Sequence, residues 1–147
     1  MLRNLAAVIV GYIVIVLFVM ATFNIAWIVI GAADGFKPGT TDVTTKWLTI
    51  AIPLSLIAAV LGGVTAAAIS RSGGGIKGLA LFVLLLGLVF AVINLVGPRP
   101  ALPKPPSELG AMEAATYARA PVWYDFTIPF LGAIGVLIGG AMKRSRR

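Results

Sequence analysis

The sequence contains no cysteine and no histidine among its 147 residues. The lack of cysteine excludes a disulfide framework, a thiolate nucleophile and cysteine-ligated zinc or iron–sulfur sites. The lack of histidine removes the commonest general base, the commonest metal ligand and the usual axial ligand of haem. We therefore expect no catalytic residue, no metal site and no cofactor, and the chain is not predicted to be an enzyme.

Charged residues are also scarce, at 12% of the chain, whereas hydrophobic residues make up 59%. A soluble domain usually carries about 25% charged and about 45–50% apolar residues. The composition therefore excludes a soluble globular domain, a disordered tail and a disulfide scaffold. It predicts an all-α, polytopic membrane protein built as a bundle of transmembrane helices.

Four apolar runs are long enough to span a bilayer, which takes about 20 mostly apolar residues. The expected spans are about 5–30, 47–69, 78–96 and 126–142 of a single domain. None of the runs alternates between apolar and polar residues, so a transmembrane β-barrel is excluded. A signal peptide is the alternative for the first run, but its apolar region would be only ~7–15 residues long. We expect a retained membrane helix.

Basic residues are distributed unequally between the two sides that four spans would create. The side with both termini carries seven on short segments: Arg3, Arg71, Lys77, Lys143, Arg144, Arg146 and Arg147. All five acidic residues fall on the other side, in longer loops. The positive-inside rule then predicts cytoplasmic termini in an inner, or plasma, membrane. The basic tail is interpreted as an anchor to anionic lipid, and no nucleic-acid partner is expected.

Aromatic residues gather at the outer ends of the expected spans, which is typical of side chains at head-group level. They are Trp27, Trp47, Trp123, Tyr117 and Tyr124.

Small residues recur every four positions in the second and fourth spans, and such rows let helix backbones approach closely. The expected helix-packing interface comprises Ser55, Ala58, Ala59, Gly62, Gly63, Ala66, Ala67, Gly132, Gly135 and Gly139. These faces could bind each other within the monomer or bind another chain.

Two asparagines, Asn24 and Asn94, lie inside the expected spans toward their outer ends. They could occupy one level and hydrogen-bond across the bundle. A contact with a quinone, carotenoid or lipid head group is the alternative.

The segment 97–125 forms a proline-rich outer loop, much longer than the about 2–8 residues that join adjacent antiparallel helices. Ser107 and Glu108 resemble a helix start, with Leu109, Met112 and Thr116 expected on one face. The loop is either a docking surface for a partner protein or a rigid spacer. The candidate docking residues are Pro98, Pro100, Pro103, Pro105, Pro106, Leu109, Met112 and Tyr117.

The layout resembles small uncharacterised four-span proteins of bacterial inner membranes. The resemblance is carried by Gly62-Gly63 with Ala66 to Ala68 before Arg71, and by Leu131 to Gly140 before the basic tail. It implies no activity or ligand. We expect an accessory or scaffold subunit that packs against a larger membrane complex, with lipids and other membrane subunits, or itself, as partners. The alternative is a small oligomeric transporter or channel for a small solute.

Overall fold

The computed structural model describes residues 1–70, 73–98 and 101–145, and four of its helices are long and apolar enough to cross a membrane. In chain order the elements are α1 Leu2–Ile30, α2 Ala32–Gly35, α3 Thr45–Ile69, α4 Gly74–Val96, the 3₁₀ turn η1 Pro106–Glu108, α5 Ala111–Tyr117 and α6 Val122–Ser145. The prediction of an all-α, multi-pass membrane bundle is confirmed.

Three of the four spans begin about one helical turn before the expected residue. α1, α4 and α6 start at Leu2, Gly74 and Val122, because hydropathy marks the hydrocarbon-crossing part of a helix and not its polar first turn. Asp125 consequently lies in the first turn of α6, where the helix dipole stabilises a carboxylate.

The ends of α1 and α3 are joined by a short, tightly turned connection. Gly31, with φ of +76°, ends α1 and leads directly into the four-residue α2. Thr44 then caps α3, because its side chain accepts a hydrogen bond from the backbone N–H of Trp47. α3 continues as a helix through Pro53.

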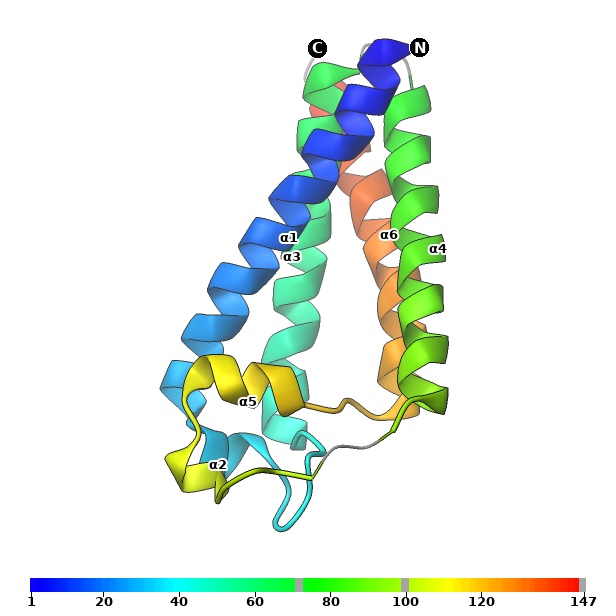
Figure 1. Ribbon diagram of the computed structural model, residues 1–147. Helices are drawn as coiled ribbons and strands as arrows, with labels where there is room; N and C mark the ends of the chain where they lie inside the picture. The colour runs from blue at the N-terminus through cyan, green and yellow to red at the C-terminus, as the bar shows by residue number, and fades with distance from the viewer. Residues whose placement is uncertain (71–72, 99–100, 146–147) are drawn as a thin grey trace.

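The four long helices form two neighbouring pairs, α1 with α3 and α4 with α6, and extensive contact between α3 and α6 joins the pairs (Figure 1). The start of α1 and the end of α6 lie at the same end of the bundle, here named the terminal end, and α2 and α5 lie at the other, the loop end (Figure 1). The two pairs converge at the terminal end and diverge toward the loop end (Figure 1). Close packing is therefore concentrated at the terminal end.

Two separate cores follow from this shape. In the terminal half, alanines and branched side chains from all four spans pack around the fully buried Leu79 and Val136. At the loop end, a second core joins the ends of α1 and α3 to α2 and α5. The second core lies outside the part of the bundle where the four spans meet.

The outer-loop helix differs from the expectation. α5 begins at Ala111 and not near Ser107, because residues 106–108 form a separate 3₁₀ turn. Its buried residue is Ala114, while Met112 and Thr116 are exposed. The expected apolar face was wrong because the compact methyl of Ala114 allows the helix to lie close against α1.

Candidate functional site

The first small-residue row of α3, which contains Ala58, Gly62 and Ala66, packs against α1. A Cβ atom at Gly62 would lie 2.9 Å from the carbonyl oxygen of Gly11, and one at Gly11 would lie 3.0 Å from the carbonyl oxygen of Gly62. Ala58 and Ala66 are completely buried. The α1 and α3 backbones therefore touch at a glycine pair that leaves no room for a side chain.

The second row, which contains Ala59 and Gly63, packs against α6. A Cβ at Gly63 would overlap the backbone carbonyl of Val136, and one at Gly139 would overlap that of Val60. Gly135 approaches Ala59, with 2.8 Å between Cβ positions. Ser55 extends the contact, because it hydrogen-bonds with the Tyr124 side chain of α6. Ala67, at the other end of this row, is buried.

The faces predicted from the small-residue pattern therefore meet each other inside the chain. Gly132 belongs to a different contact, because its Cβ would lie 3.0 Å from the Val83 side chain of α4. Gly140 also faces α4, at Ile76. α6 thus uses one glycine row against α3 and a second against α4, and α3 lies between α1 and α6.

The asparagines Asn24 and Asn94 do not pair across the bundle as the sequence suggested. The Asn24 side chain donates to the carbonyl of Met20 in its own helix at 2.8 Å. Asn94 instead accepts a hydrogen bond from Arg119 at 2.8 Å. The pairing was wrong because α1 and α4 diverge toward the loop end (Figure 1), and both asparagines lie in the last two turns of their helices.

Arg119 ties the outer loops to the bundle, a role that the sequence did not reveal. Its guanidinium donates to Asn94 and, at 3.2 Å, to the carbonyl of Pro98, both at the end of α4. It also attracts the carboxylate of Asp125 on α6, to which Asn94 hydrogen-bonds. Its backbone N–H donates to the carbonyl of Thr41 at 2.9 Å. One residue thereby joins α4, α6 and the first outer loop.

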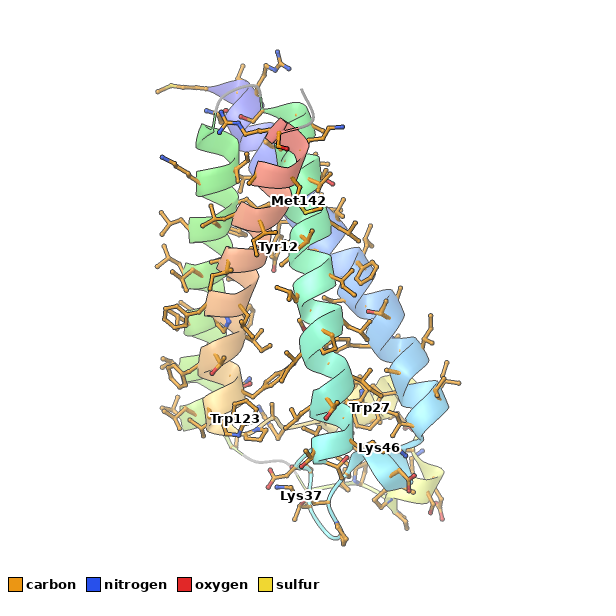
Figure 2. The ribbon with its side chains drawn as sticks, turned by 180° about the vertical axis from the view of Figure 1, so that it is seen from behind. Tyr12, Trp27, Lys37, Lys46, Trp123 and Met142 are labelled. Atoms are coloured by element: carbon orange, nitrogen blue, oxygen red, sulfur yellow. The ribbon has the colours of Figure 1, made fainter. Side chains whose placement is uncertain are left out.

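The loop end is closed by an aromatic cluster, here named the cap core, built on Trp27 and Trp47. Their rings stack with centroids 4.2 Å apart, and Phe36 lies 5.0 Å from Trp27. The two tryptophans are only 2% and 5% exposed. Both rings are therefore covered by protein and do not face lipid, whereas Trp123, at the start of α6 (Figure 2), is 55% exposed.

The proline-rich loop covers this cap core. Leu109 and Ala114 are buried in it, and Leu102 packs at its edge. Among the candidate docking residues, Pro106 and Tyr117 are half-buried, and Pro100 lies outside the described residues. Four candidates are exposed: Pro98, Pro103, Pro105 and Met112. Fewer of the candidate docking residues are therefore exposed to a partner than the sequence indicated.

Glu113 fixes the start of α5 through two hydrogen bonds. Its carboxylate accepts from the ammonium of Lys104 at 2.9 Å and from the backbone N–H of Gly110 at 3.0 Å. The hydrogen bond from Lys104, followed by that from Gly110, lowers the pKa of Glu113 below its usual 4.5.

Acid should therefore loosen α5. Because the pKa of Glu113 is lower in the folded state than in the unfolded chain, its contribution to stability is fully present above about pH 4.5 and is lost as the pH falls through the lower folded value. After correction for intrinsic exchange rates, we expect the protection of the Ala114 amide from deuterium exchange to fall below pH 4.5 in the parent protein and to change little with pH in Glu113→Gln. Equal acid sensitivity in both proteins would contradict this assignment.

Comparisons with protein-family models, with curated proteins and with solved structures find no match to this chain. We therefore infer the function of the chain from its own geometry. Among the described residues, no three potential His, Cys, Asp or Glu ligands come together. What the arrangement offers is outward apolar faces on the long helices and a folded cap at the loop end.

Proposed function

We propose that this integral membrane protein is a non-catalytic accessory or scaffold subunit that packs against a larger membrane protein complex of a bacterial inner membrane. The observation that carries the proposal is the folding of the proline-rich loop into a fixed cap with an exposed outer surface. A loop that only joined α4 to the neighbouring α6 would not need to cross to α1 and bury Leu109 and Ala114 there.

The use of the glycine rows also supports this proposal. Because they hold α1, α3, α4 and α6 to one another, the chain has the contacts of a self-sufficient unit. Large apolar side chains then face outward on α1 and α4, where lipid or another subunit can cover them. Examples are Leu17, Met20, Ile28, Leu85, Phe90 and Ile93.

The polar side chains within the spans favour a scaffold over the alternative, a small oligomeric transporter or channel. A transport path needs polar groups directed along one route. Thr22, Asn24 and Thr65 instead hydrogen-bond to carbonyls about one turn back in their own helices. Each of these side chains thus directs a hydrogen bond to its own helix and not along a shared route.

Met112 offers a direct test of the cap surface, since it is 63% exposed on α5 and lies outside the cap core. We expect Met112→Lys to release a stoichiometric membrane partner when the protein is purified from native membranes in mild detergent. A single charge placed in the buried centre of an interface typically costs enough to lower partner recovery several-fold.

Met142→Lys is the matched control. Met142 is also exposed, but it lies at the terminal end of α6, far from the cap (Figure 2). This variant should keep the partner and the thermal stability of the parent protein. Equal partner recovery with Met112→Lys and Met142→Lys would remove the cap from the proposed interface. A homo-oligomer without other subunits would favour the transporter alternative.

The same proposal places both termini in the cytoplasm, following the basic residues at the terminal end. Because the chain has no cysteine, single introduced cysteines report orientation without background. In intact cells we expect Lys104→Cys to react with an impermeant maleimide and Ser145→Cys to react only after the membrane is opened. The reverse pattern would overturn the orientation.

A further inference from the structure

A groove opens between α1 and α3 beside the cap core, with which it shares Ala26 and Ile30. It has a volume of about 270 Å³ and lies in the half of the bundle nearer the loop end. Ile25 and Val29 form its α1 wall, and Ile50 and Leu54 form its α3 wall. The one hydroxyl in the lining, that of Thr22, is bonded to the carbonyl of Phe18. The groove therefore presents an apolar surface at membrane depth.

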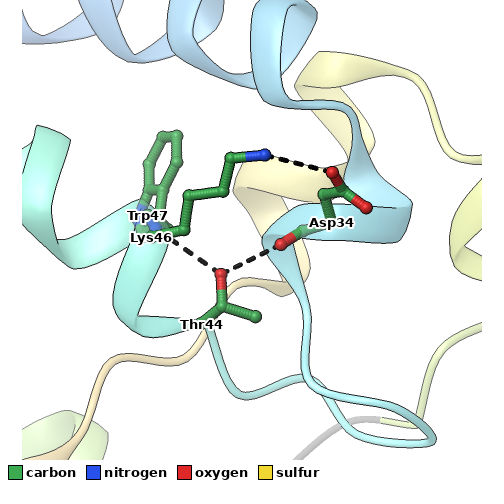
Figure 3. Close-up of polar contacts among 4 residues, drawn as sticks. All are labelled: Asp34, Thr44, Lys46 and Trp47. Atoms are coloured by element: carbon green, nitrogen blue, oxygen red, sulfur yellow. Dashed lines mark hydrogen bonds and ion pairs between the residues drawn. The ribbon is translucent and has the colours of Figure 1, made fainter.

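A pair of opposite charges lies at the loop end of this groove. Lys46, Ile50 and Leu54 follow one another at four-residue spacing and so share one face of α3. The Lys46 ammonium lies 3.1 Å from the Asp34 carboxylate of α2, which begins directly after α1 (Figure 3). The two side chains are 59% and 66% exposed. An ammonium and a carboxylate are thus accessible one turn beyond the apolar walls.

We propose that this groove binds a glycerophospholipid with a zwitterionic primary-amine head group, of the phosphatidylethanolamine type. An acyl chain lies between Ile25 and Leu54, the phosphate contacts the Lys46 ammonium, and the lipid ammonium donates hydrogen bonds to Asp34. The arrangement matches charge to charge: the protein's cation meets the lipid's anion, and the protein's carboxylate meets the lipid's cation. Lys46 also lies in the first turn of α3, where the helix dipole favours a phosphate.

Charge and hydrogen bonding distinguish this lipid from the two other common classes. An anionic phosphatidylglycerol satisfies Lys46 but offers no cation to Asp34. Phosphatidylcholine carries a trimethylated ammonium, which has no N–H to donate to the carboxylate. The Lys46–Asp34 pair is largely exposed, so it contributes little by itself and can open to admit a head group.

The test is native mass spectrometry of the full chain in micelles containing equal amounts of the three lipid classes. We expect the parent protein to retain phosphatidylethanolamine preferentially. Asp34→Asn should lower that preference about fivefold, the size expected for one exposed charge-assisted hydrogen bond. Lys46→Gln should reduce the retention of all three phospholipids.

Leu54→Trp fills the groove and should abolish lipid retention, whereas Leu85→Trp on the exposed face of α4 should not. If Leu54→Trp fails to fold, Ile25→Trp on the exposed opposite wall provides the same block. Equal retention of the three lipid classes by the parent protein, a preference for phosphatidylglycerol, or unchanged retention in a folded groove-filling variant would each overturn the proposal.

Discussion

Gly63→Leu should be among the most damaging single substitutions in this protein. Even the first side-chain atom of any other residue would overlap the Val136 carbonyl, which belongs to a helix backbone and cannot move aside alone. Overpacking a close contact typically costs about 1–3 kcal/mol and sometimes more. We expect Gly63→Ala to lower the midpoint of thermal unfolding by several degrees and Gly63→Leu to prevent recovery of a monodisperse protein.

Ala68→Leu is the matched control for this prediction. Ala68 lies on the same helix only a few residues away but is exposed on the lipid-facing side. The added bulk should therefore change the unfolding midpoint little. If Gly63→Leu and Ala68→Leu had the same stability, the α3–α6 contact would not be as close as described.

Trp47→Ala should have the second large effect, through the cap core and not through the membrane-spanning bundle. Removing this ring leaves a cavity beside Trp27 and Phe23, whose rings it contacts. Truncation of a buried tryptophan typically costs about 3–5 kcal/mol. We expect protease sensitivity in residues 101–120 and a lower unfolding midpoint, with the contacts of the terminal half retained.

Trp123→Ala separates this explanation from head-group anchoring. Trp123 is more than half exposed and makes a smaller contribution to buried surface. If all three tryptophans were interfacial anchors, their alanine variants would lose similar stability. A clearly larger loss for Trp47→Ala than for Trp123→Ala supports the cap core, and equal losses would contradict it.

The spans were predictable because hydropathy and length are local properties of the sequence. The four-residue spacing in α3 likewise identified two small rows, since spacing fixes which residues share a helix face. It could not tell which neighbour each row meets. That assignment depends on reciprocal contacts such as Gly62 with Gly11 and Gly63 with Val136, which join residues far apart in the chain.

The cap was predicted poorly for a related reason. A tryptophan at the end of a span satisfies the same composition rule whether it lies among lipid head groups or is buried by another segment. Trp27 and Trp47 are buried because α2 and the loop containing Leu109 fold over them. Arg119 gave no local signal either, because its partners Asn94 and Thr41 come from two other segments.

The central claim, that the small-residue rows of α3 are used for packing within one chain, is tested most directly by comparing the mass of the purified protein in mild detergent with that of Gly63→Ala. Both rows already contact α1 and α6 of the same chain. We therefore expect Gly63→Ala to lower the midpoint of thermal unfolding and to leave the mass unchanged. A parent dimer that dissociates in Gly63→Ala while the unfolding midpoint stays the same would contradict the account.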